Sequence, residues 1–165
     1  MCRAYVDAQR DYAAARGKAG GIVEYAQKFV SAPGQRDGLY WPTDAGEEPS
    51  PLGVLVAQAR AEGYDAGRHH QQPTPFHGYY YRILTQQGKD APGGAYDYLA
   101  NGHMIGGFAL VAFPATYGDS GVMTFIVNQD GTIFEKNLGP DTAAIARQMR
   151  EFDPDPSWRK VGATE

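Results

Sequence analysis

The chain has a single cysteine and no long hydrophobic run, and each shortage excludes a class of protein. Cys2 alone rules out an internal disulfide framework. No stretch approaches the roughly 18–20 apolar residues that a membrane-spanning helix needs, so we expect no membrane span in this chain. The first four residues do not begin the hydrophobic region of a signal peptide, and we expect no export signal in the sequence as it stands.

An excess of positive charge is missing as well. The 15 basic and 19 acidic residues leave a net charge of −4, and the pI is about 5.5. Without a broad basic field, binding to nucleic acid is not expected. The length of 165 residues is that of one domain, 1–165, built around one core.

Turn-forming residues and aromatics are plentiful, with 21 glycines, 11 prolines and 11 tyrosines. The most informative stretch is residues 106–140, where three short β-type runs follow one another at 108–113, 122–127 and 132–136. Pro114 stops the first run, and glycine-rich turns at 118–121 and 128–131 open the next two. Spacing this tight leaves room for hairpins and none for crossover helices, so an antiparallel sheet is predicted.

Helical periodicity is found on both sides of this sheet. Apolar residues recur at helical spacing over 2–16 and 22–31, and Ser50-Pro51 is a typical start for a third helix that Gly63 would end. Pro140 and Asp141 predict the start of a last helix, which reaches about Phe152.

The order of these elements predicts an α+β fold. Residues 1–63 form a helical part, residues 77–137 an antiparallel sheet of about four strands, and residues 140–152 a C-terminal helix. The strand at 77–85 comes first, and Asn101-Gly102 is suited to a hairpin turn. We expect the helices to pack on one face of the sheet, with Trp158 and Val161 folding back toward it.

Three histidines are the metal-ligand candidates, namely His69, His70 and His77. Zinc ligands must converge from defined spacings, whereas Pro73 and Pro75 prevent a helix here and adjacent side chains on an extended chain point apart. We therefore favour a solvated loop and expect no metal or other cofactor. A metal-dependent hydrolase that uses these three side chains remains the alternative.

One strand carries the binding-site candidates. In the run 79–83, alternation places Tyr80 and Arg82 on one face and the other three side chains on the opposite face, which we expect to be the core. Tyr80 and Arg82 are predicted to line a surface groove, with Trp41 or Trp158 nearby. The motif Gly-Asp-Ser-Gly at 118–121 is interpreted as a turn rather than a protease nucleophile, because no suitably placed histidine accompanies it.

An ordered series of motifs resembles one bacterial family, domain-of-unknown-function family 2950. The landmarks are CRAYV at 2–6, GLYWP at 38–42, PLG at 51–53, HGYYYRIL at 77–84, GFALVA at 107–112, YG at 117–118, GVMTF at 121–125 and LGPDT at 138–142. The resemblance spans nearly the whole chain. It implies an exported, periplasmic or secreted protein of Gram-negative bacteria, in which this chain is the C-terminal part of a longer precursor. A weaker similarity of pattern, a long first helix followed by an antiparallel sheet, is to pilins and pseudopilins.

These observations predict a non-catalytic extracytoplasmic binding or assembly module of the cell envelope, whose partner is an unidentified envelope protein or a small ligand. A metal-dependent hydrolase and a pseudopilin-like filament subunit are the two alternatives. The histidines and the missing hydrophobic assembly segment of pilins are the features that would distinguish them.

Overall fold

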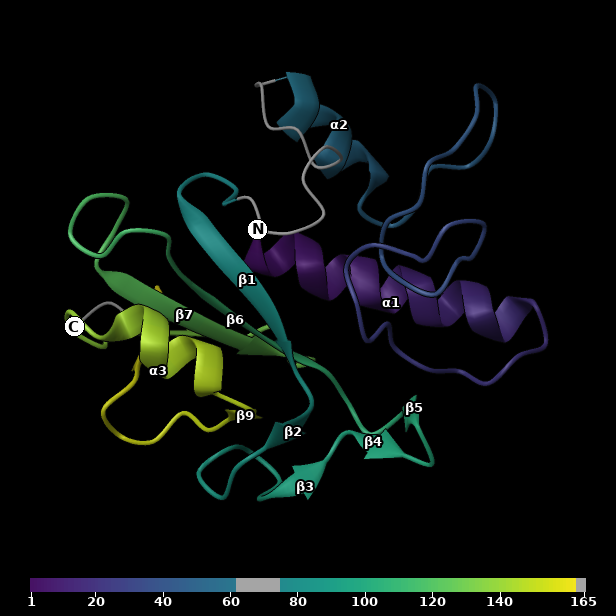
Figure 1. The fold of residues 1–165 in the computed structure, drawn as a ribbon. Coiled ribbons are helices and arrows are strands. Elements are labelled where there is room, and N and C mark those ends of the chain that lie inside the picture. Colours follow the sequence, from purple (N-terminus) through teal and green to yellow (C-terminus); the bar gives the residue numbers. More distant parts are fainter. Residues whose placement is uncertain (62–74, 163–165) are drawn as a thin grey trace.

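The computed structural model describes residues 1–61 and 75–162, and it has an α+β fold as predicted (Figure 1). Its helices are α1 (Cys2–Lys18), α2 (Gly53–Ala61) and α3 (Thr142–Gln148). The strands of the main sheet are β1 (Tyr79–Leu84), β6 (Ala109–Pro114), β7 (Met123–Asn128), β8 (Ile133–Asn137) and β10 (Arg159–Lys160). The shorter strands are β2 (Gln86–Gln87), β3 (Tyr96–Asp97), β4 (Leu99–Ala100), β5 (His103–Met104) and β9 (Glu151–Phe152).

The main sheet is antiparallel throughout and has the strand order β1-β6-β7-β8-β10. It has five strands rather than about four, because the tail after α3 returns to pair with β8. The two hairpin turns form where glycine was expected to allow them. Gly121 accepts a hydrogen bond from Gly118 at 2.9 Å, and Gly131, with a φ of 77°, donates to Asn128 at 2.9 Å.

Helices cover both faces of the sheet, and the expectation of a single covered face was wrong. Successive side chains of β1 point to opposite faces. Burial and the neighbouring Cys2 of α1 raise the pKa of the Tyr81 hydroxyl, whereas Arg82 donates to the backbone of α3. In Figure 1, α3 lies against one side of β6 and β7 while the start of α1 lies behind β1. All six residues of β6 are buried, as expected for a strand that is covered twice.

Two small sheets flank the main one. The predicted hairpin at Asn101-Gly102 is confirmed: both residues have positive φ, 52° and 81°, and β4 pairs with β5 in antiparallel fashion. The other small sheet has the order β3-β2-β9, and its β2–β9 pair is parallel. This parallel pair forms between segments far apart in the sequence, so the turn spacing did not reveal it.

Three helix predictions need correction. Residues 22–31 are not helical, because Tyr25 pairs with Met104 and Val30 pairs with Tyr40 instead. The helix expected from Ser50 begins only at Gly53, and Gly63 lies outside the described residues. The last helix ends at Gln148 rather than near residue 152, since Glu151–Phe152 pair with β2 as β9.

The core lies on both sides of β6. Its largest fully buried aromatic side chains come from α1, the β3–β4 connection, the residue before β6, β6 itself and β9; they are Tyr5, Tyr98, Phe108, Phe113 and Phe152. Among the described residues, no helix combines the length and the apolar character needed to cross a membrane.

Candidate functional site

The second half of α1 supports an irregular segment, residues 20–41, that wraps beside it. Gln9 is fully buried, and its side-chain amide replaces a strand partner for Ala26. Its Oε1 accepts a hydrogen bond from the Ala26 N–H at 2.7 Å, and its Nε2 donates to the Ala26 C=O at 2.8 Å. The N–H and C=O of Ala26 are therefore both hydrogen-bonded although the segment forms neither helix nor strand there. The segment can thus stay irregular while some of its side chains line a pocket.

The β4–β5 hairpin approaches this segment from the other side. Tyr25 donates its backbone N–H to Met104 at 2.8 Å in an antiparallel bridge, and Glu24 and His103, the residues that precede these two partners, lie diagonally across it. The His103 Nδ1 lies 2.7 Å from the Glu24 Oε2. An ionised carboxylate only accepts hydrogen bonds, so Nδ1 carries the hydrogen and Nε2 is left as the second polar atom of the ring.

Glu24 is the centre of a three-residue cluster with Arg16 and His103. Its side chain is only 10% exposed, and its Oε1 accepts a hydrogen bond from the Arg16 Nη2. Burial by itself raises the pKa of Glu24, but the hydrogen bonds from His103 and Arg16 outweigh burial and hold the pKa below its ordinary value. The carboxylate is therefore ionised and bonded through both oxygens. Arg16 also lies over the Tyr12 ring, with 6.0 Å between the guanidinium carbon and the ring centroid.

A second ion pair lies across the same hollow. The Lys28 Nζ is 2.5 Å from the Asp37 Oδ2, and the Asp37 Oδ1 accepts the backbone N–H of Ala32 at 2.9 Å. The hydrogen bond from Lys28, followed by that from Ala32, lowers the pKa of Asp37. Tyr12 lines the same pocket, and its pKa is raised by burial and by the charges of Glu24 and Asp37, against the effect of Arg16.

These groups line a pocket of about 440 Å³. Its walls consist of Tyr12, Arg16, Glu24, Tyr25, Gln27, Lys28, Asp37, Gly102 and His103. The volume falls within the range of about 300–1,000 Å³ that is usual for small-molecule sites. Its lining is more polar than is usual for such sites, with two tyrosines among charged and amide side chains that are fixed by hydrogen bonds. This pocket is the candidate functional site.

Trp41, one of the three predicted binding residues, is not among the residues that line this pocket, although it ends the same wrapping segment. It follows the Val30–Tyr40 bridge, is half-buried and packs against the core cluster. The Arg36 guanidinium lies 5.4 Å from its ring centroid. Trp41 is thus held by contacts within the fold, and its role in binding stays a prediction.

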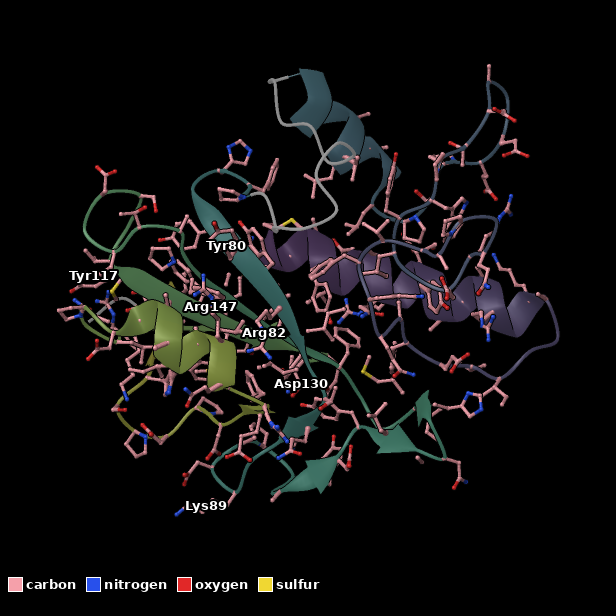
Figure 2. The ribbon with its side chains drawn as sticks, viewed as in Figure 1. Tyr80, Arg82, Lys89, Tyr117, Asp130 and Arg147 are labelled. Carbon is pink, nitrogen blue, oxygen red and sulfur yellow. The ribbon has the colours of Figure 1, made fainter. Side chains whose placement is uncertain are left out.

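Tyr80 and Arg82 project from β1 toward α3 (Figure 2). The Tyr80 ring packs on Phe113, its cross-strand partner, with 5.7 Å between centroids. Arg82 donates through Nη1 to two carbonyls at the end of α3, Ala146 at 2.6 Å and Met149 at 3.2 Å. Through these hydrogen bonds Arg82 connects β1 to the end of α3, which is a structural role. The surface groove expected beside Tyr80 and Arg82 stays a prediction.

The predicted histidine cluster is only partly described. His69 and His70 lie outside the described residues. His77 lies in the turn before β1 with a φ of 49°, and its ring centroid is 4.1 Å from that of Phe76. Within residues 1–61 and 75–162, no three histidine, cysteine, aspartate or glutamate side chains are grouped as a metal ion would require.

Fold and pocket together define an α+β protein with a charged, aromatic pocket beside its first helix. The chain belongs to the family described as "Protein of unknown function (DUF2950)", which matches residues 1–161. This confirms the family that the sequence motifs indicated. No curated protein and no solved structure matches the chain.

Sequence reasoning missed the residues of the pocket. Glu24 and His103 are 79 positions apart, and no motif links them. The one usable signal was Asn101-Gly102: a hairpin predicted there places the next residue, His103, at the start of a strand. The pairing partner of that hairpin could not be inferred from spacing alone.

Proposed function

We propose that this protein is a non-catalytic extracytoplasmic binding module of the bacterial cell envelope, and that it holds a small polar ligand in the pocket beside α1. The observation that carries the proposal is the convergence of Arg16, Glu24 and His103 in a pocket that is also walled by tyrosine. Each of these side chains comes from a different segment of the chain, so the fold itself assembles the site.

Glu24 itself is suited to recognition rather than to proton transfer. A general acid or base works best when its pKa is close to the working pH. The Glu24 pKa is moved the other way, below its ordinary value, by the two partners that hold the carboxylate. Glu24 therefore acts as a fixed anion that orients Arg16 and His103, whose side chains are each 41% exposed and can reach a ligand.

The proposed location rests on the motif series that resembles exported proteins. An extracytoplasmic module of this kind would present the pocket to solutes or to envelope polymers. A role in assembly with an envelope protein is compatible with the same pocket, if the polar ligand is part of that partner.

The test is a titration followed through the imidazole signals of the protein's four histidines. Small probes are added one class at a time: neutral sugars, amino acids, dicarboxylates and diamines. At least one class is expected to shift the His103 signal in a saturable way, while His77, in the turn before β1, serves as the internal control. If no class moves His103, the proposed binding function is wrong.

The replacement His103→Ala identifies the moving signal and should abolish it. A second variant, Lys89→Met, changes an exposed side chain in the loop between β2 and β3, well separated from α1 (Figure 2). It should leave the titration unchanged. A ligand response that survives His103→Ala with equal strength would place binding outside the pocket.

A further inference from the structure

The charges in the pocket cancel, and each is already paired inside the protein. Two cations, Arg16 and Lys28, face two anions, Glu24 and Asp37. All four carboxylate oxygens have a partner: those of Glu24 bind Arg16 and His103, and those of Asp37 bind Lys28 and the Ala32 backbone. A charged group on a ligand would therefore meet a like charge close beside each opposite one, so its charge would add little to binding while the group loses hydration.

The remaining polar groups suit a neutral ligand. His103 offers its Nε2, and Gln27, which is held by a 2.7 Å hydrogen bond from its Nε2 to the Gly102 carbonyl, keeps its Oε1 as an acceptor. Arg16 and Lys28 carry more N–H groups than their bonds to Glu24 and Asp37 use. Donors and acceptors are thus both present in the pocket, which suits hydroxyl groups because each hydroxyl both donates and accepts.

The tyrosines supply the apolar side of the site. The Tyr25 ring is fixed by an edge contact with Phe108, with 4.7 Å between centroids, and remains half-exposed where it lines the pocket. Tyr12 is buried with Arg16 over its ring, and it also lines the pocket. A saturated ring with C–H groups on its faces and hydroxyls at its edge would match both the aromatic and the polar wall.

We propose that the ligand class is a neutral saccharide, bound as one or two pyranose rings with the two ion pairs kept intact. This inference rests on the proposed function, since it names the ligand of the same pocket. It goes further in stating that the site excludes charged relatives of the sugar.

The test uses three analogues that share one ring and differ only in the charge of one substituent: methyl glucoside, methyl glucuronide and the corresponding aminodeoxy glucoside. Cellobiose is added as the two-ring probe. Binding to the complete chain is measured by calorimetry and by the His103 signal. The neutral probes are expected to bind, and both charged analogues are expected to bind about tenfold more weakly, which corresponds to about 1.4 kcal/mol.

Two variants should each remove this preference for one of the charged analogues if the paired charges cause it. Lys28→Met leaves the Asp37 carboxylate without its cation and should shift the relative affinity about tenfold toward the aminodeoxy glucoside. Asp37→Asn leaves Lys28 without its anion, while its amide oxygen can still accept the Ala32 N–H, and should shift the preference toward the glucuronide. Lys89→Met is the matched lysine control and should keep the wild-type order.

The outcomes separate the two proposals. If a charged analogue binds the wild type as tightly as methyl glucoside or more tightly, or if an amino acid or dicarboxylate moves His103 while no sugar does, the saccharide assignment is overturned and pocket binding stands. If no probe of any class moves His103, both proposals fall. Co-sedimentation with insoluble cellulose distinguishes the source: retention identifies binding to the polymer, and binding of cellobiose alone identifies a site for free sugar.

Discussion

The carboxylate of Asp153 lies directly over the bare Cα of Gly88. A Cβ at residue 88 would be 2.3 Å from the Asp153 Cγ and 2.5 Å from its Oδ1. The same Oδ1 accepts the backbone N–H of Asp90 at 2.7 Å, and Gly88 donates to Phe152 at 3.0 Å. This contact ties the loop after β2 to β9 and explains how the parallel β2–β9 pair is held.

The replacement Gly88→Ala should therefore destabilise the protein. The added methyl group has no space unless Asp153 gives up its hydrogen bond to Asp90, so we expect the free energy of unfolding to fall by about 1–3 kcal/mol. Gly21→Ala is the control, because a Cβ there would meet its nearest atom, the Arg16 carbonyl, at 3.4 Å. Chemical denaturation of both variants checks the prediction, and equal stability of the two would contradict it.

Arg82→Ala should destabilise the protein through α3. The variant removes a charged donor from the Ala146 and Met149 carbonyls at the negative end of the helix dipole, for an expected loss of about 1.5–3 kcal/mol. Arg147→Ala removes an exposed arginine from the same helix and should change stability by less than about 0.5 kcal/mol. Thermal unfolding of both proteins is the measurement. If Arg82→Ala unfolds like the wild type, Arg82 is free for the binding role that the sequence suggested.

The contribution of Glu24 to stability should depend on pH in one direction. Its folded-state pKa lies below the ordinary value of 4.5, because the hydrogen bonds from His103 and Arg16 outweigh the effect of burial. Its stabilising contribution is therefore fully present above pH 4.5 and is lost as the pH falls through the lower folded-state pKa. The difference in unfolding free energy between the wild type and Glu24→Gln should shrink over that range.

Denaturation curves from neutral pH down to acid pH measure this difference. Arg16→Met removes one partner of the carboxylate, so the same comparison made in an Arg16→Met background should show a smaller acid-dependent loss. A difference that stays constant or grows as the pH falls would show that Glu24 is not held as an ion by these partners.

The metal-dependent alternative makes its own prediction. If His69, His70 and His77 bind zinc, elemental analysis of the purified protein will find one equivalent, and His77→Ala will remove it. The binding function proposed above predicts no stoichiometric metal and no change of the sugar affinities in His77→Ala. Stoichiometric zinc that is lost in the variant would favour the hydrolase.

Local signals predicted the central hairpins well. Strands β6, β7 and β8 are bounded by Pro114 and by glycines whose positive φ depends on local sterics alone, so the turns could be placed within one or two residues. The first helix was equally clear, since its buried residues, such as Tyr5, Gln9 and Tyr12, recur at helical spacing.

The segment 22–31 shows why periodicity failed elsewhere. Ile22 and Val30, two members of the expected apolar stripe, are 50% and 55% exposed. The conformation is decided by a distant partner, Gln9, and by the close approach of Gly38, where a Cβ would lie 2.9 Å from the Ser31 nitrogen. Neither contact can be inferred from the local spacing of apolar residues.

The pocket could not be predicted from the sequence either, because it too depends on contacts between distant segments. Its cluster joins α1, the wrapping segment and the β4–β5 hairpin, and these meet only when the chain has folded. Arg16, Glu24 and His103 are each ordinary residues in their own sequence context. Their chemistry arises from distances that no spacing rule encodes.

A crystal structure of the protein grown with cellobiose would test the pocket most directly. We predict sugar density in contact with His103 and Tyr25, with the Arg16–Glu24 and Lys28–Asp37 pairs unbroken. Sugar bound elsewhere, or a pocket in which either ion pair has opened to admit it, would contradict the assignment.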